Sequence, residues 1–244
     1  ARALRYWGMV QEKSGALTLA EALFTLAESL SAEDDENRAA CLEHRGSLLR
    51  QQRDLEGSEQ LLQRALEIYR RTEKPWLIAD CLRELGGTRL LRGYPEEAYI
   101  LLREALERYE KLGSRTGQAG CLNNLAEIER KSGELAAAEQ HYRAAFEMMR
   151  VQGHHASPIP LLNIGQIQRS QGRFQDAQES FLSGLSLARQ LKRRVPELYA
   201  CAFLLDCQVH LGSQKGWEEN LQRALQLSES TGLVDPEIAE AAER

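Results

Sequence analysis

The side chains best suited to chemistry in this sequence are polar groups that recur at corresponding places along the chain. Asn124 and Asn163 occupy the same place in two similar segments, CLNNLAEIERKSGELAAAEQHYRAA and PLLNIGQIQRSQGRFQDAQESFLSG. Arg130 and Arg169 follow them at the same spacing. An amide offers both a hydrogen-bond donor and an acceptor, and a guanidinium group binds carboxylates. These residue types therefore suit a peptide ligand, and an acidic or C-terminal peptide in particular.

No pattern in the sequence indicates catalysis. A Gly-rich phosphate loop, a nucleophile elbow and a His-Glu-x-x-His sequence are all missing. The adjacent pair His154 and His155 falls in a predicted linker without a carboxylate or Cys nearby, which favours a solvated loop over a metal site. Carboxylate pairs such as Glu96 and Glu97 are typical of helix starts. We expect a protein that is not an enzyme and that uses no metal ion or cofactor.

The composition is that of a helical protein with mixed surface charge. The chain has 244 residues, 43% hydrophobic and 27% charged, with only 6 Pro and a formal net charge of −5. No basic block is present, so nucleic acid is not an expected partner. No apolar run reaches the roughly 18–20 residues that span a bilayer, and no signal peptide is visible, so we expect no membrane partner and a cytoplasmic location. The start at Ala1 without Met suggests a segment cut from a longer protein.

The elements that position the polar groups repeat at a fixed period. A Gly or Ala on the first helix of each unit recurs at intervals of 38 to 40 residues, with Leu in the last unit: Gly8, Gly46, Gly86, Ala126, Gly165 and Leu205. Such a period is typical of a solenoid of helical hairpins. Seven residues later come the positions that we expect to end the first helix in the left-handed conformation: Gly15, Arg53, Gly93, Gly133, Gly172 and Gly212.

Further registers agree with the first. Small side chains that allow two helices to approach closely are predicted at Ala20, Ser58, Ala98, Ala138 and Ala177, with Trp217 as the exception in the sixth unit. The large side chains predicted to fill the space between helices are Phe24, Leu62, Leu102, Tyr142, Phe181 and Leu221. The sixth unit, which carries both Leu205 and Trp217, is therefore expected to be the most irregular.

These residues resemble the tetratricopeptide repeat pattern, in which Trp7-Gly8, Gly15, Ala20, Phe24 and Ala27 of the first unit all find matches. The spacing near 40 is similar to the long repeat variants of kinesin light chains and of bacterial signalling ATPases, kinases and activators. The resemblance implies an all-α fold, a right-handed superhelix (α-solenoid) of about six helical hairpins. It also implies that the first helices line an inner, ligand-binding surface.

The expected domain organisation follows from the repeat. We predict a single superhelical domain over residues 1–244, with repeats at about 1–34, 39–74, 79–115, 119–154, 158–194 and 198–232, and the start of a further or capping helix at 236–244. The predicted helix pairs are 1–13/16–30, 37–52/55–72, 76–92/95–111, 117–132/135–151, 158–171/174–190 and 196–211/214–231.

The cysteines follow the repeat as well. Cys41, Cys81 and Cys121 occupy the third position of their units, where a small and partly buried side chain is expected. Equivalent sites in stacked units should lie beyond the distance of about 7 Å between Cα atoms that a disulfide tolerates. We interpret them as reduced structural thiols.

The candidate ligand-binding residues lie at inner-face positions of the first helices. In family members that hold extended peptides, an Asn at the sixth position bonds the ligand backbone, and the resemblance assigns this role to Asn124 and Asn163. Arginines at nearby positions add charge. We also assign Glu127 and Gln166 to the peptide-binding inner face, so the full set is Asn124, Asn163, Arg83, Glu127, Arg130, Gln166, Arg169 and Arg50.

An alternative role for the arginines stays open, since Arg130 and Arg169 could simply pair with Glu127 or other neighbours on a solvated face. The carboxylate clamp of chaperone-binding relatives is not expected, because its paired Lys and Arg residues are missing.

Three classes of function fit these observations. The first is a non-catalytic interaction module that binds an extended peptide or partner helix, as a scaffold within a larger signalling protein. The second is an effector-sensing regulatory segment attached to an ATPase, kinase or DNA-binding domain. The third is self-association through the exposed ends of the repeat array.

Overall fold

The computed structural model describes residues 1–151, 157–213 and 216–233. These residues form helices and no β-strand, which confirms the all-α fold class. The helices are α1 (Arg2–Ser14), α2 (Leu17–Ser29), α3 (Asp35–Gln51), α4 (Leu55–Arg71), α5 (Pro75–Leu91), α6 (Pro95–Lys111), α7 (Arg115–Ser132), α8 (Leu135–Val151), α9 (Ile159–Ser170), α10 (Phe174–Gln190), α11 (Arg194–His210) and α12 (Trp217–Thr231). They match the expected pairs to within a few residues. The helix predicted from residue 236 lies outside the described residues.

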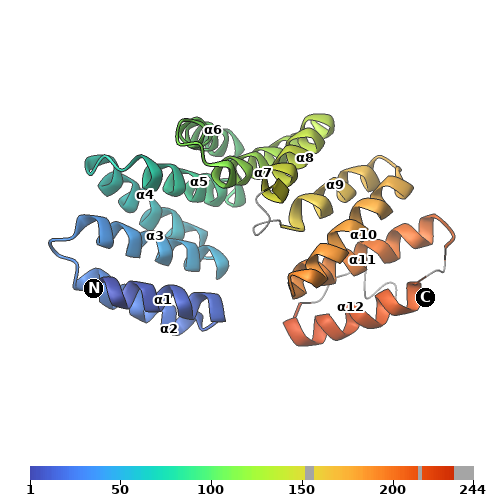
Figure 1. Cartoon of the computed structure of the whole chain (residues 1–244), viewed down its shortest axis with the longest axis horizontal. Coiled ribbons are helices and arrows are strands. Elements are labelled where there is room, and N and C mark those ends of the chain that lie inside the picture. Colours follow the sequence, from blue (N-terminus) through green and yellow to red (C-terminus); the bar gives the residue numbers. More distant parts are fainter. Residues whose placement is uncertain (152–156, 214–215, 234–244) are drawn as a thin grey trace. The chain divides into compact units, whose positions relative to one another are not determined.

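The chain divides into two compact units, residues 1–128 and 129–244, which we describe separately. In the first unit, the antiparallel hairpins α1/α2, α3/α4 and α5/α6 stack in sequence order, with α2 against α3 and α4 against α5 (Figure 1). In the second unit, α8 packs against α9, followed by the hairpins α9/α10 and α11/α12. A single domain and a right-handed superhelical path over the whole chain stay predictions.

Local sequence signals explain where several helices begin. The side chain of Asp34 accepts a hydrogen bond from the backbone N–H of Asn37 at 3.0 Å, and Asp54 caps α4 in the same way through Gly57 at 2.9 Å. Such caps satisfy N–H groups that have no partner within the helix. Helices α5 and α6 instead begin with a proline, whose fixed φ suits the first helical position.

The breaks inside the hairpins have the expected backbone conformation. All six predicted positions have a positive φ, between 62° and 88°: Gly15, Arg53, Gly93, Gly133, Gly172 and Gly212. Glycine adopts this region without strain, whereas a residue with a Cβ atom does not. Arg53, with a φ of 69°, is thus the strained member of the set.

We predict that Arg53→Gly stabilises the protein. The exposed Arg53 side chain makes no described hydrogen bond or ion pair, so the substitution relieves backbone strain of about 1 kcal/mol without loss of a contact. The reverse change at the equivalent turn, Gly93→Arg, should destabilise by a similar amount. Urea unfolding of both variants measures the effect, and a destabilised Arg53→Gly variant would contradict it.

The close approach of paired helices also follows the predicted registers. A Cβ atom at Gly165 would lie 2.4 Å from the ring of Phe181, and one at Gly8 would lie 2.7 Å from the ring of Phe24. Both rings are completely buried. The small residue on the first helix therefore makes room for the large residue on the second, as the sequence predicts.

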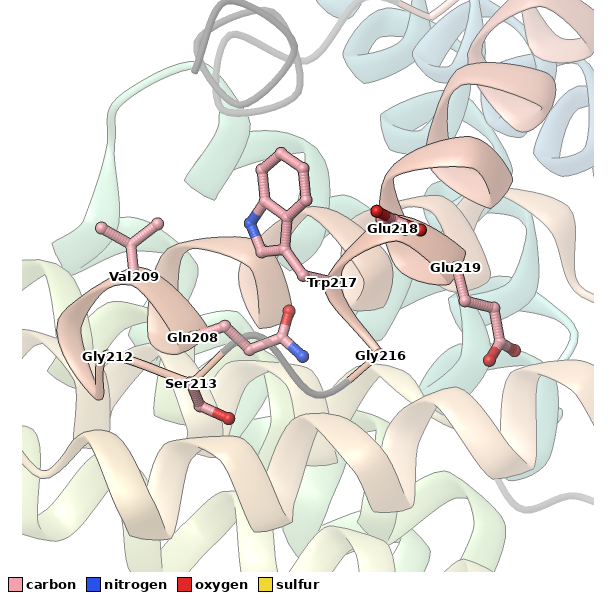
Figure 2. A pocket seen from close by; sticks show the side chains of 8 residues that line it. All are labelled: Gln208, Val209, Gly212, Ser213, Gly216, Trp217, Glu218 and Glu219. Carbon is pink, nitrogen blue, oxygen red and sulfur yellow. The ribbon is translucent and has the colours of Figure 1, made fainter.

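In the sixth hairpin, α12 starts at Trp217, later than the predicted residue 214, and the expected wider spacing of its two helices stays a prediction. The second helices α2, α4, α6, α8 and α10 all begin nine residues after their anchor position, whereas α12 begins at Trp217, twelve residues after Leu205. Trp217 and the end of α11 border a cavity of about 730 Å³, with Gln208 and Val209 on the α11 side (Figure 2). The bulky Trp in place of Ala thus lies at a cavity lined by the end of α11 and the start of α12.

All five cysteines are free and buried, including Cys201 and Cys207 in α11. Burial raises the pKa of the Cys41 thiol to about 11 and that of Cys121 to about 12. The thiol of Cys81 donates to the carbonyl oxygen of Leu62 at 3.2 Å. Cys41, Cys81 and Cys121 are free and buried, which agrees with their interpretation as reduced structural thiols.

Candidate functional site

In the first unit, a half-buried ion-pair cluster links α3 and α5. The carboxylate of Glu84 accepts from Nη2 of Arg50 at 2.5 Å and pairs with Nη2 of Arg83 at 2.8 Å. Burial opposes the charged form of Glu84, but the two guanidinium groups outweigh it and lower the pKa of this carboxyl group. The carboxylate therefore stays ionised and holds both arginines in fixed positions.

Two more carboxyl groups of this unit accept hydrogen bonds from tyrosine hydroxyls. The hydroxyl of Tyr69 donates to Glu43 at 2.8 Å, and that of Tyr109 donates to Asp80 at 2.5 Å. Burial raises the pKa of Glu43 to about 8 and also raises the pKa of Asp80. Next to Glu43, burial lowers the pKa of His44 to about 4. Glu43 and His44 are thus both uncharged near neutral pH.

We predict that Glu43→Gln removes a pH dependence of stability. The folded-state pKa of Glu43 is raised above its ordinary value of 4.5, so its contribution is fully present below about pH 4.5 and is lost as pH rises toward 8. Glutamine keeps an acceptor for Tyr69 but cannot ionise. Urea unfolding between pH 4.5 and 8 should show a flatter profile for the variant, while an unchanged slope would show that Glu43 ionises normally.

Asn124 of α7 approaches the same part of the first unit. A Cβ atom at Gly87 of α5 would lie 3.5 Å from Nδ2 of Asn124 and 3.5 Å from Nη1 of Arg50. Three successive first helices, α3, α5 and α7, thus bring an arginine, a glycine and an amide together. The Asn124 side chain is half-buried and makes no hydrogen bond to any other described residue.

In the second unit, three of the predicted residues line one cavity of about 530 Å³. Arg130, Gln166 and Arg169 border it. The remaining lining residues, which the sequence reasoning missed, are Leu135, Ile167, Ser170, Phe174, Asp206 and His210. The cavity therefore combines guanidinium and amide donors with an acidic and an aromatic wall.

Arg169 is positioned by α11. Its Nη1 donates to Oδ2 of Asp206 at 3.2 Å, and its guanidinium carbon lies 5.3 Å from the ring centroid of Phe203. Phe174 and His210 stack nearby with ring centroids 4.2 Å apart. The pairing of Arg169 with a neighbour is confirmed, with Asp206 as the partner.

The structure groups the predicted residues by unit. Arg50, Arg83 and Asn124 gather in the first unit, and Arg130, Gln166 and Arg169 gather in the second. Asn163 on α9 is half-buried and, like Asn124, has no hydrogen-bond partner among the described residues. Glu127 and Arg130 each interact with another group.

Several residues of these clusters carry a signal that the sequence reasoning passed over. Gly87 and Asp206 occupy the same repeat position as Gln166, which the sequence does assign to the inner face, so Asp206 is predictable there as well. Glu84 occupies the position of Asn124 one repeat earlier. A single comparison of acidic and basic residues across successive repeats could have found these groups.

Within the described ranges, no group of three or more His, Cys, Asp or Glu residues is arranged to hold a metal ion. None of the described helices is both long and apolar enough to cross a membrane.

Comparison with known proteins identifies the repeat. A family model described as tetratricopeptide repeat matches residues 37–111, 77–151 and 117–190. No curated protein matches the chain.

Several solved structures share this fold. A Rap protein complexed with competence and sporulation factor is 20% identical, with a TM-score of 0.78 over 98% of this chain and 66% of its own. The Rap conjugation gene regulator of plasmid pLS20, in complex with the Phr* peptide, is 17% identical, with a TM-score of 0.74 over 93% of this chain and 62% of its own.

A signal transduction ATPase with numerous domains from Pyrococcus horikoshii, which has a tetratricopeptide repeat sensor, is 15% identical. Its TM-score is 0.76 over 98% of this chain and 37% of its own. The chain thus spans less than two thirds of the length of each of these three proteins.

Proposed function

The chain belongs to the tetratricopeptide repeat family, and from that premise we propose that it is a non-catalytic module that binds an extended peptide or partner helix through its first helices. It acts as part of a larger signalling protein. The observation that carries this proposal is the state of Asn124 and Asn163, whose half-buried amides have no hydrogen-bond partner among the described residues. A half-buried amide that is not bonded within the described protein can both donate to and accept from the backbone of a bound peptide.

The similarity to a peptide-bound protein supports the proposal. The Rap regulator of pLS20 is in complex with the Phr* peptide, and its likeness extends over 93% of this chain. The cavity of the second unit also suits a peptide, since Arg130 and Gln166 offer donors beside the Phe174 ring. A peptide side chain with an acidic or amide end fits this combination.

We predict that Asn124→Ala and Asn163→Ala each weaken peptide binding by about 1–3 kcal/mol and leave the fold intact. Neither side chain is bonded within the described protein, so its loss removes no intramolecular contact of that kind. Peptides selected by display on the unmodified chain serve as ligands, and isothermal titration measures their affinity. The matched control is Gln60→Ala, which removes an exposed amide from the second helix α4.

Two outcomes would count against this assignment. If both Asn variants bind the peptide as tightly as the unmodified chain does, the two amides do not belong to the binding site. A large loss of melting temperature would show that they support the fold instead.

A second candidate function is an effector-sensing segment that controls an attached domain. The observation that favours it is the likeness to the sensor-bearing ATPase, which extends over 98% of this chain. In this case the cavity lined by Arg130, Gln166 and Arg169 binds a small anionic effector. A thermal-shift screen with small carboxylates and phosphates separates the two functions, because a sensor responds saturably to one of them and loses the response in Gln166→Ala.

A further inference from the structure

Gly87 stands in the middle of α5, directly after Gly86, and packing does not explain it. A glycine inside a helix is about 0.5–1 kcal/mol less favourable than alanine. For Gly86 the reason is clear, because a Cβ atom there would lie 2.8 Å from Cγ of Leu102. At Gly87 a Cβ atom would meet only Arg50 Nη1 and Asn124 Nδ2, each at an ordinary contact distance of 3.5 Å. The fold would accept an alanine here, so the bare backbone serves another purpose.

The second unit contains the same arrangement with a carboxylate in place of this glycine. Arg50 and Arg169 occupy one repeat position, and Gly87 and Asp206 occupy another position in the repeat that follows each of them. Nη1 of Arg169 donates to Oδ2 of Asp206 at 3.2 Å. Nη1 of Arg50 lies over Gly87 and has no hydrogen-bond partner among the described residues. The first unit therefore lacks the acceptor that the second unit provides from its own chain.

The surroundings of Gly87 favour an anion. Nη2 of Arg50 is held by Glu84, which also pairs with Arg83, so Nη1 of Arg50 is the cationic donor that is left over Gly87. Two nitrogens that each lie 3.5 Å from one point are close enough for the two oxygens of a single carboxylate to reach both. One donor is a guanidinium group, and charge-assisted bonds of this kind are stronger than neutral ones. A carboxylate is thus preferred over a neutral carbonyl.

We propose that Arg50 and Asn124, which converge over Gly87, form a carboxylate-binding site in the first unit, where a carboxylate of the bound peptide takes the place that Asp206 fills in the second. This inference rests on the proposed function, which it deepens by naming the group recognised. The carboxylate comes from an acidic side chain or from the peptide C-terminus. Gly87, which is itself buried, places no Cβ atom beside the two nitrogens.

The test uses small probes, so it does not depend on an identified peptide. N-acetylglutamate N-methylamide represents a side-chain carboxylate, acetyl-glycyl-glycine represents a terminal one, and N-acetylglutamine N-methylamide is the neutral control. NMR of the full chain follows the side-chain amide signals of Asn124 during each titration. We expect a saturable shift of these signals with a carboxylate probe and a far weaker shift with the neutral probe. The carboxylate probe that binds more tightly shows whether the recognised group is an acidic side chain or a peptide C-terminus.

Substitutions at Gly87 make the test specific. Gly87→Asp supplies an internal carboxylate to Arg50, as Asp206 does for Arg169. We expect this variant to bind the carboxylate probe about tenfold or more weakly, because one hydrogen bond to a charged group contributes at least that factor to the affinity. The matched control is Gln60→Asp, which adds the same charge at an exposed position of the second helix α4. Gly87→Ala should keep or raise the melting temperature, by up to about 2–4 °C, because the helix gains a better helix former.

Three results would overturn the site: equal shifts with the neutral probe, no shift with either carboxylate probe, or unchanged affinity in Gly87→Asp. A clearly lower melting temperature of Gly87→Ala would also overturn it, because the glycine would then serve packing. Failure of this site and failure of the proposed function are distinguishable. If display-selected peptides bind the unmodified chain and the Gly87→Asp variant equally well, only the carboxylate site is refuted. If the carboxylate probes bind but no peptide ligand can be selected, only the proposed function is refuted.

Discussion

Most of the hairpins depend on one steric constraint, which is that a residue with no side chain on the first helix faces a large side chain on the second. The distances of 2.4 Å from a Cβ atom at Gly165 to the Phe181 ring, and of 2.7 Å from one at Gly8 to the Phe24 ring, show how little room is left. Packed interiors do not absorb an added atom at such distances without movement of the backbone. The constraint fixes which side of each first helix is buried, and so it also fixes which side is left for polar groups.

The polar side repeats for the same reason, but its contacts do not repeat. Arg50 and Arg169 occupy one repeat position, yet Arg50 pairs with Glu84 whereas Arg169 bonds Asp206 and lies on the ring of Phe203. A long side chain near the end of a first helix reaches the next first helix, and the residues that it meets there differ from repeat to repeat. The repeat therefore specifies a place for each group, and the neighbouring repeat specifies its chemistry.

This difference explains what could be predicted from the sequence. The hairpins and their breaks follow from Gly, Ala and large apolar residues at fixed spacing, and even Arg53 adopts the positive φ that its position requires. The start of α12 was predicted too early, because the pattern did not show how Trp217 would alter the helix start. The clusters were harder to predict, since they join residues from different repeats. Glu84 departs from the Asn pattern at its position, yet it holds both Arg50 and Arg83.

The neighbouring residues Glu43 and His44 give the first unit a further property. Burial raises the pKa of Glu43 to about 8 and lowers the pKa of His44 to about 4. Both side chains therefore stay uncharged between about pH 5 and 7. Close to this pair, Glu84 keeps its charge because the neighbouring guanidinium groups lower its pKa. Acidification within this interval therefore leaves the charge of both members of the pair unchanged, although one of them is a histidine.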